Sequence, residues 1–465
     1  MSSSDIAIDA SRNSPTPGEG TTSTPSLEGL HASIPVPSSK AGFWPQLRAF
    51  IGPAILVSVG YMDPGNWGTD LEAGAKFRYG LLWVVALSSL MAMVMQVCCA
   101  RLGLVTGKDL AQACRDYYPA WSRWPLWFFC EVAIGACDLA EVLGSAVALN
   151  LLFGIPLFWA VLITAFDVLL LLALRGMGMR LIEAVIAVLV GTIGLCYFIE
   201  LFVLPQTAPS VVEMGRAVLT PSLGETGMLY LAIGIIGATV MPHNLYLHSA
   251  LVQSRRIGTG ESALRRAIRF NTLDSVVALS IAFLVNAAIL VLAAAVFHGH
   301  DSDFGEEPDW IRVAYRTLSP LLGKVGASTL FAVALLASGQ SSTITGTLAG
   351  QVVMEGFLHW RVRPWVRRLV TRTLAILPAI IVIGLRGDGH VNDLLVLSQV
   401  VLAMQLPLAM FPLLHFTSSR RRMGQFTNGW FLLLAGWTTC LLITALDFYG
   451  LPELLEKAWK VISGR

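Results

Sequence analysis

The chain has 465 residues, of which 55% are hydrophobic and 13% charged, and its mean hydropathy is +0.66. About one quarter of the residues of a soluble globular domain are charged, so this composition excludes such a domain and predicts an all-α protein that crosses a membrane many times. The formal net charge of +2 gives no indication of a nucleic-acid partner, and we expect none.

The N-terminal segment, residues 1–44, is rich in serine, proline, threonine and glycine and contains no long apolar run. Such a segment cannot bury a core, so we expect it to be disordered. It has neither the basic start nor the apolar stretch of a signal peptide, which predicts that it stays on the cytoplasmic side. The pattern assigns it no role.

Apolar runs of about 20 residues are long enough to cross a bilayer as helices. We interpret eleven runs as spans: 46–70, 80–103, 125–153, 156–174, 181–204, 227–250, 272–297, 325–357, 370–386, 391–416 and 429–449. The seven cysteines lie mostly in these apolar segments, without the spacing of a metal site, and are interpreted as small buried hydrophobic residues.

Arginines in alternate loops predict the orientation of the spans. The arginine-rich loops are 175–180, 255–269, 361–372 and 420–422, and one of the intervening loops, 301–309, is acidic. Because short cytoplasmic loops carry an excess of Lys and Arg, this pattern places the N-terminus in the cytoplasm and, after eleven spans, the C-terminus outside.

Two spans are interrupted by proline and polar residues. The first contains the sequence DPGN at residues 63–66, and the sixth contains MPHN at residues 241–244. A lipid-exposed helix cannot be broken in this way, so the broken backbone must be buried in protein or line a cavity. Paired interruptions in corresponding halves of a membrane protein indicate the binding site of a transporter, with the second half inverted relative to the first.

The interruptions bring together the donor groups of a metal site. Proline lacks an N–H, which frees the carbonyl four residues earlier, on Gly60 for one break and on Ala238 for the other. Asp63 adds a carboxylate, Asn66 an amide oxygen and Met241 a thioether sulfur. Oxygen ligands with one sulfur suit Mn²⁺ or Fe²⁺, and also Co²⁺ and Cd²⁺, better than Mg²⁺ or Ca²⁺.

Each of these donors also has a purely structural interpretation. Met241 could fill a gap in a packed core, as most methionines do. Asp63 could pair with a buried arginine, but no arginine lies in the apolar middle of a predicted span. The position of both residues beside helix breaks favours the metal site.

The third predicted span carries Glu131, Asp138 and Glu141, and intramembrane acids usually mark an ion or proton path. Asp138 and Glu141 are three residues apart, hence on one helix face, whereas Glu131 lies near the helix end and is expected to face water. His243 follows the second break and titrates near neutral pH. The alternatives are hydrogen bonds between helices for the acids and a packing role for the histidine.

Five stretches carry a family resemblance. Besides the two breaks, these are DLAEV at 138–142, ASGQSSTITGT at 337–347 with GQ and MEG at 350–356, and LSQVV at 397–401. With these stretches the chain, from about 45 to 450, resembles the Nramp family of proton-coupled divalent metal transporters. The resemblance implies a LeuT-type fold with two inverted five-helix repeats and an eleventh helix.

The resemblance also implies roles for individual residues. It makes Asp63, Asn66, the Ala238 carbonyl and Met241 metal ligands, joined in some states by Gly60 and Gln399, although Gln399 could also serve only as a contact between helices. It implies a proton route through Asp63, His243, Glu141 and Asp138, for which position makes Arg372 the candidate basic residue. Arg255 is the candidate gating residue after the sixth span.

The predicted organisation is therefore a first repeat at 45–204 with an unwound first helix, a second repeat at 227–417 with an unwound sixth helix, and an eleventh helix at 428–450. We expect a monomeric importer in the plasma membrane that moves Mn²⁺ or Fe²⁺ together with protons and needs no cofactor. The stretch 338–347 lacks the Gly-Lys-Ser/Thr ending of a phosphate loop, so transport must draw on gradients.

Two rival functions and an enzyme are weighed against this prediction. A Na⁺-coupled amino-acid carrier would hold a carboxylate at the helix breaks, where Asp63 would repel it. A membrane sensor like the Nramp-related ethylene-signalling proteins of plants would carry a long soluble C-terminal region. An enzyme is disfavoured because no nucleophile–base pair is found at membrane depth.

Overall fold

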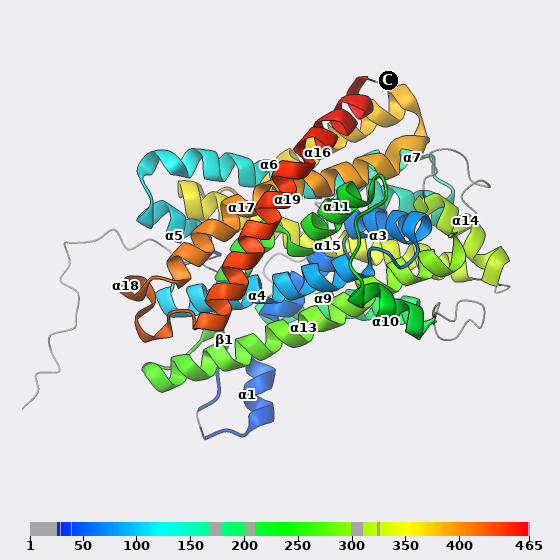
Figure 1. Ribbon diagram of the computed structural model, residues 1–465. Coiled ribbons are helices and arrows are strands. Elements are labelled where there is room, and N and C mark those ends of the chain that lie inside the picture. The colour runs from blue at the N-terminus through cyan, green and yellow to red at the C-terminus, as the bar shows by residue number, and fades with distance from the viewer. Residues whose placement is uncertain are drawn as a thin grey trace, which may run out of the picture.

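The computed structural model describes residues 26–463, apart from 28, 39, 168, 170–177, 200, 202–209, 299–309 and 323–325. Within these residues the chain is a bundle of long helices, several of them strongly tilted relative to one another (Figure 1). Eight described helices are long and apolar enough to cross a membrane. This arrangement confirms the prediction of an all-α membrane protein.

Each of the eleven predicted spans has a helical counterpart in the described residues. The first five are α1–α3 (Phe43–Phe50, Pro53–Ser58, Pro64–Phe77), α4 (Leu82–Thr106), α6 (Arg123–Phe153), α7 (Leu157–Ile163) and α9 (Met179–Phe198). The others are α11–α12 (Met228–Val240, Pro242–Leu251), α13 (Glu261–Val296), α15 (Ala327–Leu358), α16 (Pro364–Arg386), α17 (Val391–Thr417) and α19 (Trp430–Ser463). The end of the fourth predicted span, 170–174, lies outside the described residues.

Four shorter helices connect or follow the spans: α5 (Leu110–Tyr117), α10 (Val211–Leu219), α14 (Trp310–Leu322) and α18 (Arg420–Met423). Local sequence accounts for several helix ends. Asp109 caps α5 by accepting the Gln112 N–H, and glycines in the left-handed region follow α4 and α6. Proline occupies the first turn of α2, α3, α12 and α16, where its missing N–H costs nothing.

The core surrounds α6 and the two broken spans. Helix α6 packs against α15, α16 and α17, while α3 packs against α13 and α11. The broken segments α3, α11 and α12 are almost entirely buried by these neighbours. The interrupted backbone is therefore enclosed by protein, as the cost of unpaired polar groups in lipid requires.

The expectation of a disordered segment over 1–44 is wrong for the described residues between 26 and 38. Strand β1 (Ile34–Pro35) pairs in parallel with β2 (Arg255–Arg256), directly after the sixth span. Leu27 is buried, and its N–H donates to Glu355 at the end of α15 (3.0 Å). Two isolated apolar side chains, Leu27 and Ile34, anchor this otherwise polar stretch, which a composition average does not detect.

Close helix packing at Gly74 gives a test of this arrangement. A Cβ at Gly74 in α3 would lie 2.3 Å from the Leu290 carbonyl oxygen of α13, so Gly74→Ala should force the helices apart and lower stability by about 1–3 kcal/mol. Gly135→Ala in α6 is the matched control, because nothing lies within 4 Å of its Cβ position. Thermal unfolding of the detergent-purified protein measures both, and an equal effect of the two substitutions would contradict the packing.

Candidate metal site and its polar network

The first predicted break is present at Asp63. Helix α2 continues into a 3-10 turn over Val59–Met62, and Asp63 then adopts an extended conformation (φ −70°, ψ 164°) before α3 begins at Pro64. The Asp63 side chain caps α3, because its Oδ1 accepts the backbone N–H of Asn66 at 2.9 Å. A carboxylate at a helix N-terminus is stabilised by the free N–H groups and the helix dipole.

The second predicted break is present at Met241. Helix α11 ends at Val240, Met241 has φ 40° and ψ 107°, and α12 begins at Pro242. A side chain other than glycine at positive φ is strained by about 1–3 kcal/mol, and such strain concentrates at binding sites. The fully buried Met241 is held in this conformation by the surrounding helices.

Three of the predicted ligand oxygens converge on one point. The Asn66 Nδ2 lies 2.7 Å from Asp63 Oδ1, 3.0 Å from the Gly60 carbonyl oxygen and 3.2 Å from the Ala238 carbonyl oxygen. The Asn66 Oδ1 accepts a hydrogen bond from Asn286 of α13 at 3.0 Å. An amide N–H₂ thus stands among one anionic and two neutral oxygens, an environment that suits a cation.

The predicted sulfur ligand packs against the same point. A Cβ on Gly60 would lie 2.8 Å from the Met241 sulfur and 2.2 Å from Asn244 Nδ2, so only glycine lets the two breaks approach this closely. Asn244 Nδ2 in turn lies 3.4 Å from the Met241 sulfur. The donors of the first and second breaks therefore face each other across Gly60.

Gln399 also reaches the first break. A Cβ on Gly65 would lie 1.9 Å from Gln399 Nε2, which places the glutamine amide directly against the DPGN segment. Gln399 Nε2 donates to Ser398 Oγ at 2.8 Å, and its Oε1 has no hydrogen-bond partner among the described residues. The amide is thus in contact with the break through packing, with one oxygen unused.

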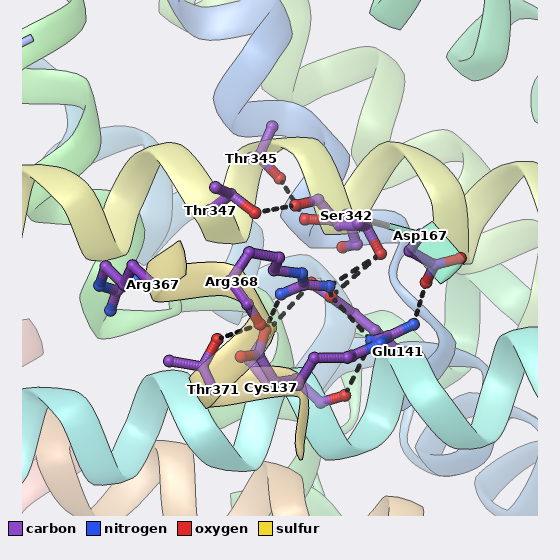
Figure 2. A network of polar contacts seen from close by, with 12 residues as sticks. Cys137, Glu141, Asp167, Ser342, Thr345, Thr347, Arg367, Arg368 and Thr371 are labelled. Carbon is purple, nitrogen blue, oxygen red and sulfur yellow. Dashed lines mark hydrogen bonds and ion pairs between the residues drawn. The ribbon is translucent and has the colours of Figure 1, made fainter. Parts of the chain in front are cut away.

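The acids of α6 pair with arginines of α16. Arg368 contacts Asp138 through one Nη atom, and through the other it contacts Glu141 at 2.7 Å and Thr343 of α15 at 3.1 Å. Figure 2 shows the Arg368 guanidinium pointing toward Glu141, with Arg367 lying apart from this group. Arg368, two residues before the predicted span 370–386, is 1% exposed, and its partners are the acids of α6 rather than Asp63.

Two further ion pairs involve α16. Arg372, the candidate basic residue of the proton route, contacts Asp167. Its Nη1 lies 3.6 Å from Glu141 Oε2. Arg367 pairs with Glu131 at 2.8 Å, and the Glu131 side chain is only 19% exposed, so the prediction that it faces water is wrong. The burial of the first arginines of α16 has one cause: the helix begins at residue 364 rather than 370, which carries them into the bundle beside α6.

Cys137 links the metal site to this network. Its Sγ lies 4.0 Å from Asp63 Oδ2 and 3.8 Å from Glu141 Oε1, one sulfur between the two acids. A thiol S–H is a weak hydrogen-bond donor, and its sulfur is a weak acceptor. His243 is buried, but no hydrogen bond joins it to the described residues, and its Nδ1 has no partner there.

The predicted gating residue lies at the end of the bundle that carries the arginine-rich loops. Arg255 pairs with Glu183 of α9 at 2.7 Å and donates to the carbonyl oxygens of Ala49 (3.2 Å) and Ile51 (2.6 Å). It therefore ties the end of the sixth span to the chain just before α2, which leads into the first break.

Sequence reasoning missed four residues of this region: Cys137, Asp167, Asn286 and Arg368. Asp167 and Asn286 had a usable signal, because each is a polar residue inside a predicted apolar span. Cys137 had none, because a cysteine inside an apolar helix is usually a packing residue. Within the described residues no three His, Cys, Asp or Glu side chains gather as for zinc, so the donor set depends on amide, carbonyl and thioether groups.

Comparisons with known proteins show the family of the chain. The profile of the family described as natural resistance-associated macrophage protein-like, Nramp, matches residues 54–453. A divalent metal cation transporter MntH from Nostoc sp. is 52% identical over 436 residues, covering 94% of this chain and 97% of its own. The MntH of Bradyrhizobium diazoefficiens is also 52% identical over 436 residues, covering 93% and 95%.

Solved structures share the fold. A mutant of the manganese transporter of Eremococcus coleocola superposes with a TM-score of 0.84 at 39% identity, covering 94% of this chain and 96% of that one. Mhp1, a nucleobase-cation-symport-1 transporter, reaches a TM-score of 0.57 at 13% identity and shares the fold alone, with 93% and 96% covered. The fold is thus the LeuT type, with two inverted five-helix repeats and an eleventh helix. The chain belongs to the Nramp family of divalent metal cation transporters, and it is a transporter rather than an enzyme.

Proposed function

We propose that this protein is a secondary active importer that moves Mn²⁺, and also Fe²⁺, Co²⁺ and Cd²⁺, together with protons by alternating access. The observation that carries the proposal is the convergence of Asp63, Gly60 and Ala238 oxygens on one point beside the Met241 sulfur. The manganese transporter named among the structural relatives supports the choice of metal. The two repeats occupy 45–204 and 227–417.

Metal binding requires the Asn66 amide to rotate. Its nitrogen now faces Asp63 and the two carbonyls, whereas a metal ion needs its oxygen there. Rotation turns the Asn66 N–H₂ toward Asn286, whose Oδ1 has no hydrogen-bond partner among the described residues. If the Asn286 amide turns as well, its Oδ1 accepts that N–H, so we assign Asn286 to hold Asn66 in both orientations.

The thioether sets the selectivity. Mg²⁺ holds its water shell strongly and Ca²⁺ prefers six to eight oxygens, so a sulfur ligand costs both ions more than it costs Mn²⁺. Met241 supplies this sulfur from a strained position that leaves little room for other ligands. Gln399 joins the ligand set in one state of the cycle, since its free oxygen is against the first break.

The proton leaves Asp63 through Cys137 to Glu141. The two sulfur–oxygen distances of 4.0 and 3.8 Å make the thiol the nearest bridge between these acids. Asp138, Arg368 and Arg372 continue the route on the far side of Glu141. The role of His243 in this route depends on a rearrangement of the second break, because it bonds to none of these groups here.

The membrane potential favours import. In the plasma membrane with the N-terminus inside, a divalent ion that enters a cell whose interior is 100 mV negative gains about 4.6 kcal/mol. Arg255 is the gate residue of the cytoplasmic side, because opening that side must release its contacts with Glu183 and the segment before α2. The C-terminus then lies outside.

Replacing the sulfur tests the metal site. Met241→Ala should retain Mn²⁺ uptake in proteoliposomes, while Ca²⁺ or Mg²⁺ should compete at about tenfold lower concentration, a shift of about 1.4 kcal/mol. Met410→Ala, which removes an equally buried methionine from α17, should leave discrimination unchanged. If both variants discriminate like the natural protein, the sulfur is not a ligand.

Replacing the acid tests the proton route. Glu141→Gln should lower metal-stimulated acidification, read with an internal pH dye, by at least tenfold, while Mn²⁺ binding measured by calorimetry stays within about threefold. The control Asp447→Asn removes a buried carboxylate from α19. Helix α19 packs chiefly against α17 rather than against α6, which carries Glu141. Undiminished acidification in the Glu141 variant would show that the proton does not pass through Glu141.

A further inference from the structure

A cavity of about 910 Å³ lies outside the transport path, between α1 and the first turns of α13. Helix α1 stands out from the main bundle beside α13 (Figure 1). The cavity is lined by the apolar side chains of Phe43, Phe270 and Leu273, by the arginines Arg265, Arg266 and Arg269, and by Gln46, Glu261 and Ser262. The three apolar side chains are called its apolar wall and the three arginines its cationic wall, and Glu261 is the acidic residue beside them.

The cationic wall carries uncompensated charge. Arg265 pairs with Glu261 and lies over the Phe426 ring at 5.8 Å. Arg266 and Arg269 form no ion pair with any described residue, and the buried Arg266 Nε has no hydrogen-bond partner there. An arginine without an ion-pair partner is suited to bind a phosphate, because one guanidinium can donate two parallel hydrogen bonds to phosphate oxygens.

One residue of the apolar wall, Phe43, belongs to α1, a helix suited to a membrane surface, whereas Phe270 and Leu273 belong to α13. Phe43 and Trp44 of α1 are 53% and 76% exposed, and Phe43 packs on Phe270 with ring centroids 5.7 Å apart. Phe270 also stacks on Phe50 at 5.5 Å, which fixes α1 beside α13. Exposed aromatic residues next to arginines are typical of a helix that lies in the boundary between headgroups and acyl chains.

We propose that this cavity binds an anionic phospholipid of the cytoplasmic leaflet. Its phosphate lies between Arg266 and Arg269, and its acyl chains follow Phe43, Phe270 and Leu273. The choice of leaflet rests on the orientation proposed above, because arginine-rich loops face the anionic cytoplasmic surface. A soluble phosphate fits less well, since it would leave the apolar wall exposed to water.

The position of the cavity connects the lipid to transport. One residue after Leu273, Asp274 accepts the backbone N–H groups of Gly52 (3.3 Å) and Ala54 (3.0 Å) at the start of α2. A lipid that bridges α1 and α13 therefore holds the segment that leads into the first break. Its presence should slow any movement of α1 away from α13.

The test measures lipid bound to the full-length, detergent-purified protein by native mass spectrometry. Phosphatidylglycerol should bind at least tenfold more tightly than phosphatidylcholine, and the doubly substituted Arg266→Gln, Arg269→Gln protein should lose this preference. Arg420→Gln with Arg421→Gln removes the same charge from another exposed arginine-rich segment and should keep it. Glycerol phosphate, added as the soluble headgroup, should not displace the lipid at equal concentration.

Several outcomes would overturn the proposal: equal binding of the two lipids, equal loss in both double variants, or full displacement by glycerol phosphate. If the double variant fails to fold, the single substitution Arg269→Gln at an exposed position replaces it, with at least a threefold loss expected. Mn²⁺ uptake in phosphatidylcholine vesicles, measured on the same proteins, separates failure of this proposal from failure of the transport function.

Discussion

The structure depends on one constraint: a backbone carbonyl or a carboxylate inside a bilayer finds no water and must be satisfied by the protein. Proline at positions 64 and 242 removes two helical hydrogen bonds and leaves the Gly60 and Ala238 carbonyls free for other donors. In this structure the Asn66 amide satisfies both. One side chain therefore supplies the hydrogen bonds that both freed carbonyls would otherwise lack.

The acids of α6 are likewise satisfied by the protein, in their case through ion pairs. A buried carboxylate that loses its partner is strongly destabilising, and Asp138 and Glu141 share one guanidinium, that of Arg368. Arg372 is close enough to Glu141 to stabilise it as well, and it is itself held by Asp167. Each charged group of this network therefore has at least one partner of opposite charge in the low-dielectric interior.

At one end of the bundle, contacts from two separate segments hold the broken spans together. At the end with the arginine-rich loops, Arg255 binds carbonyls before α2, and β1 pairs with the residues that follow α12. These contacts join the first and sixth spans, whose breaks approach each other at Gly60. The described residues of the segment before the first span thus belong to the folded body. Helix α1 rests on α13 through aromatic stacking.

The sequence alone determined the membrane class, the eleven spans and the positions of both breaks, and it placed Asp63, Asn66 and Met241 at those breaks, because hydropathy, proline and intramembrane charge act locally. Only the tertiary structure decided that Arg368 pairs with Asp138 and Glu141, that Cys137 lies between Asp63 and Glu141, and that Ile34 joins the fold. Those contacts join residues up to about 230 positions apart. Their partners depend on how helices pack and where α16 begins, and no periodicity in one chain segment encodes that.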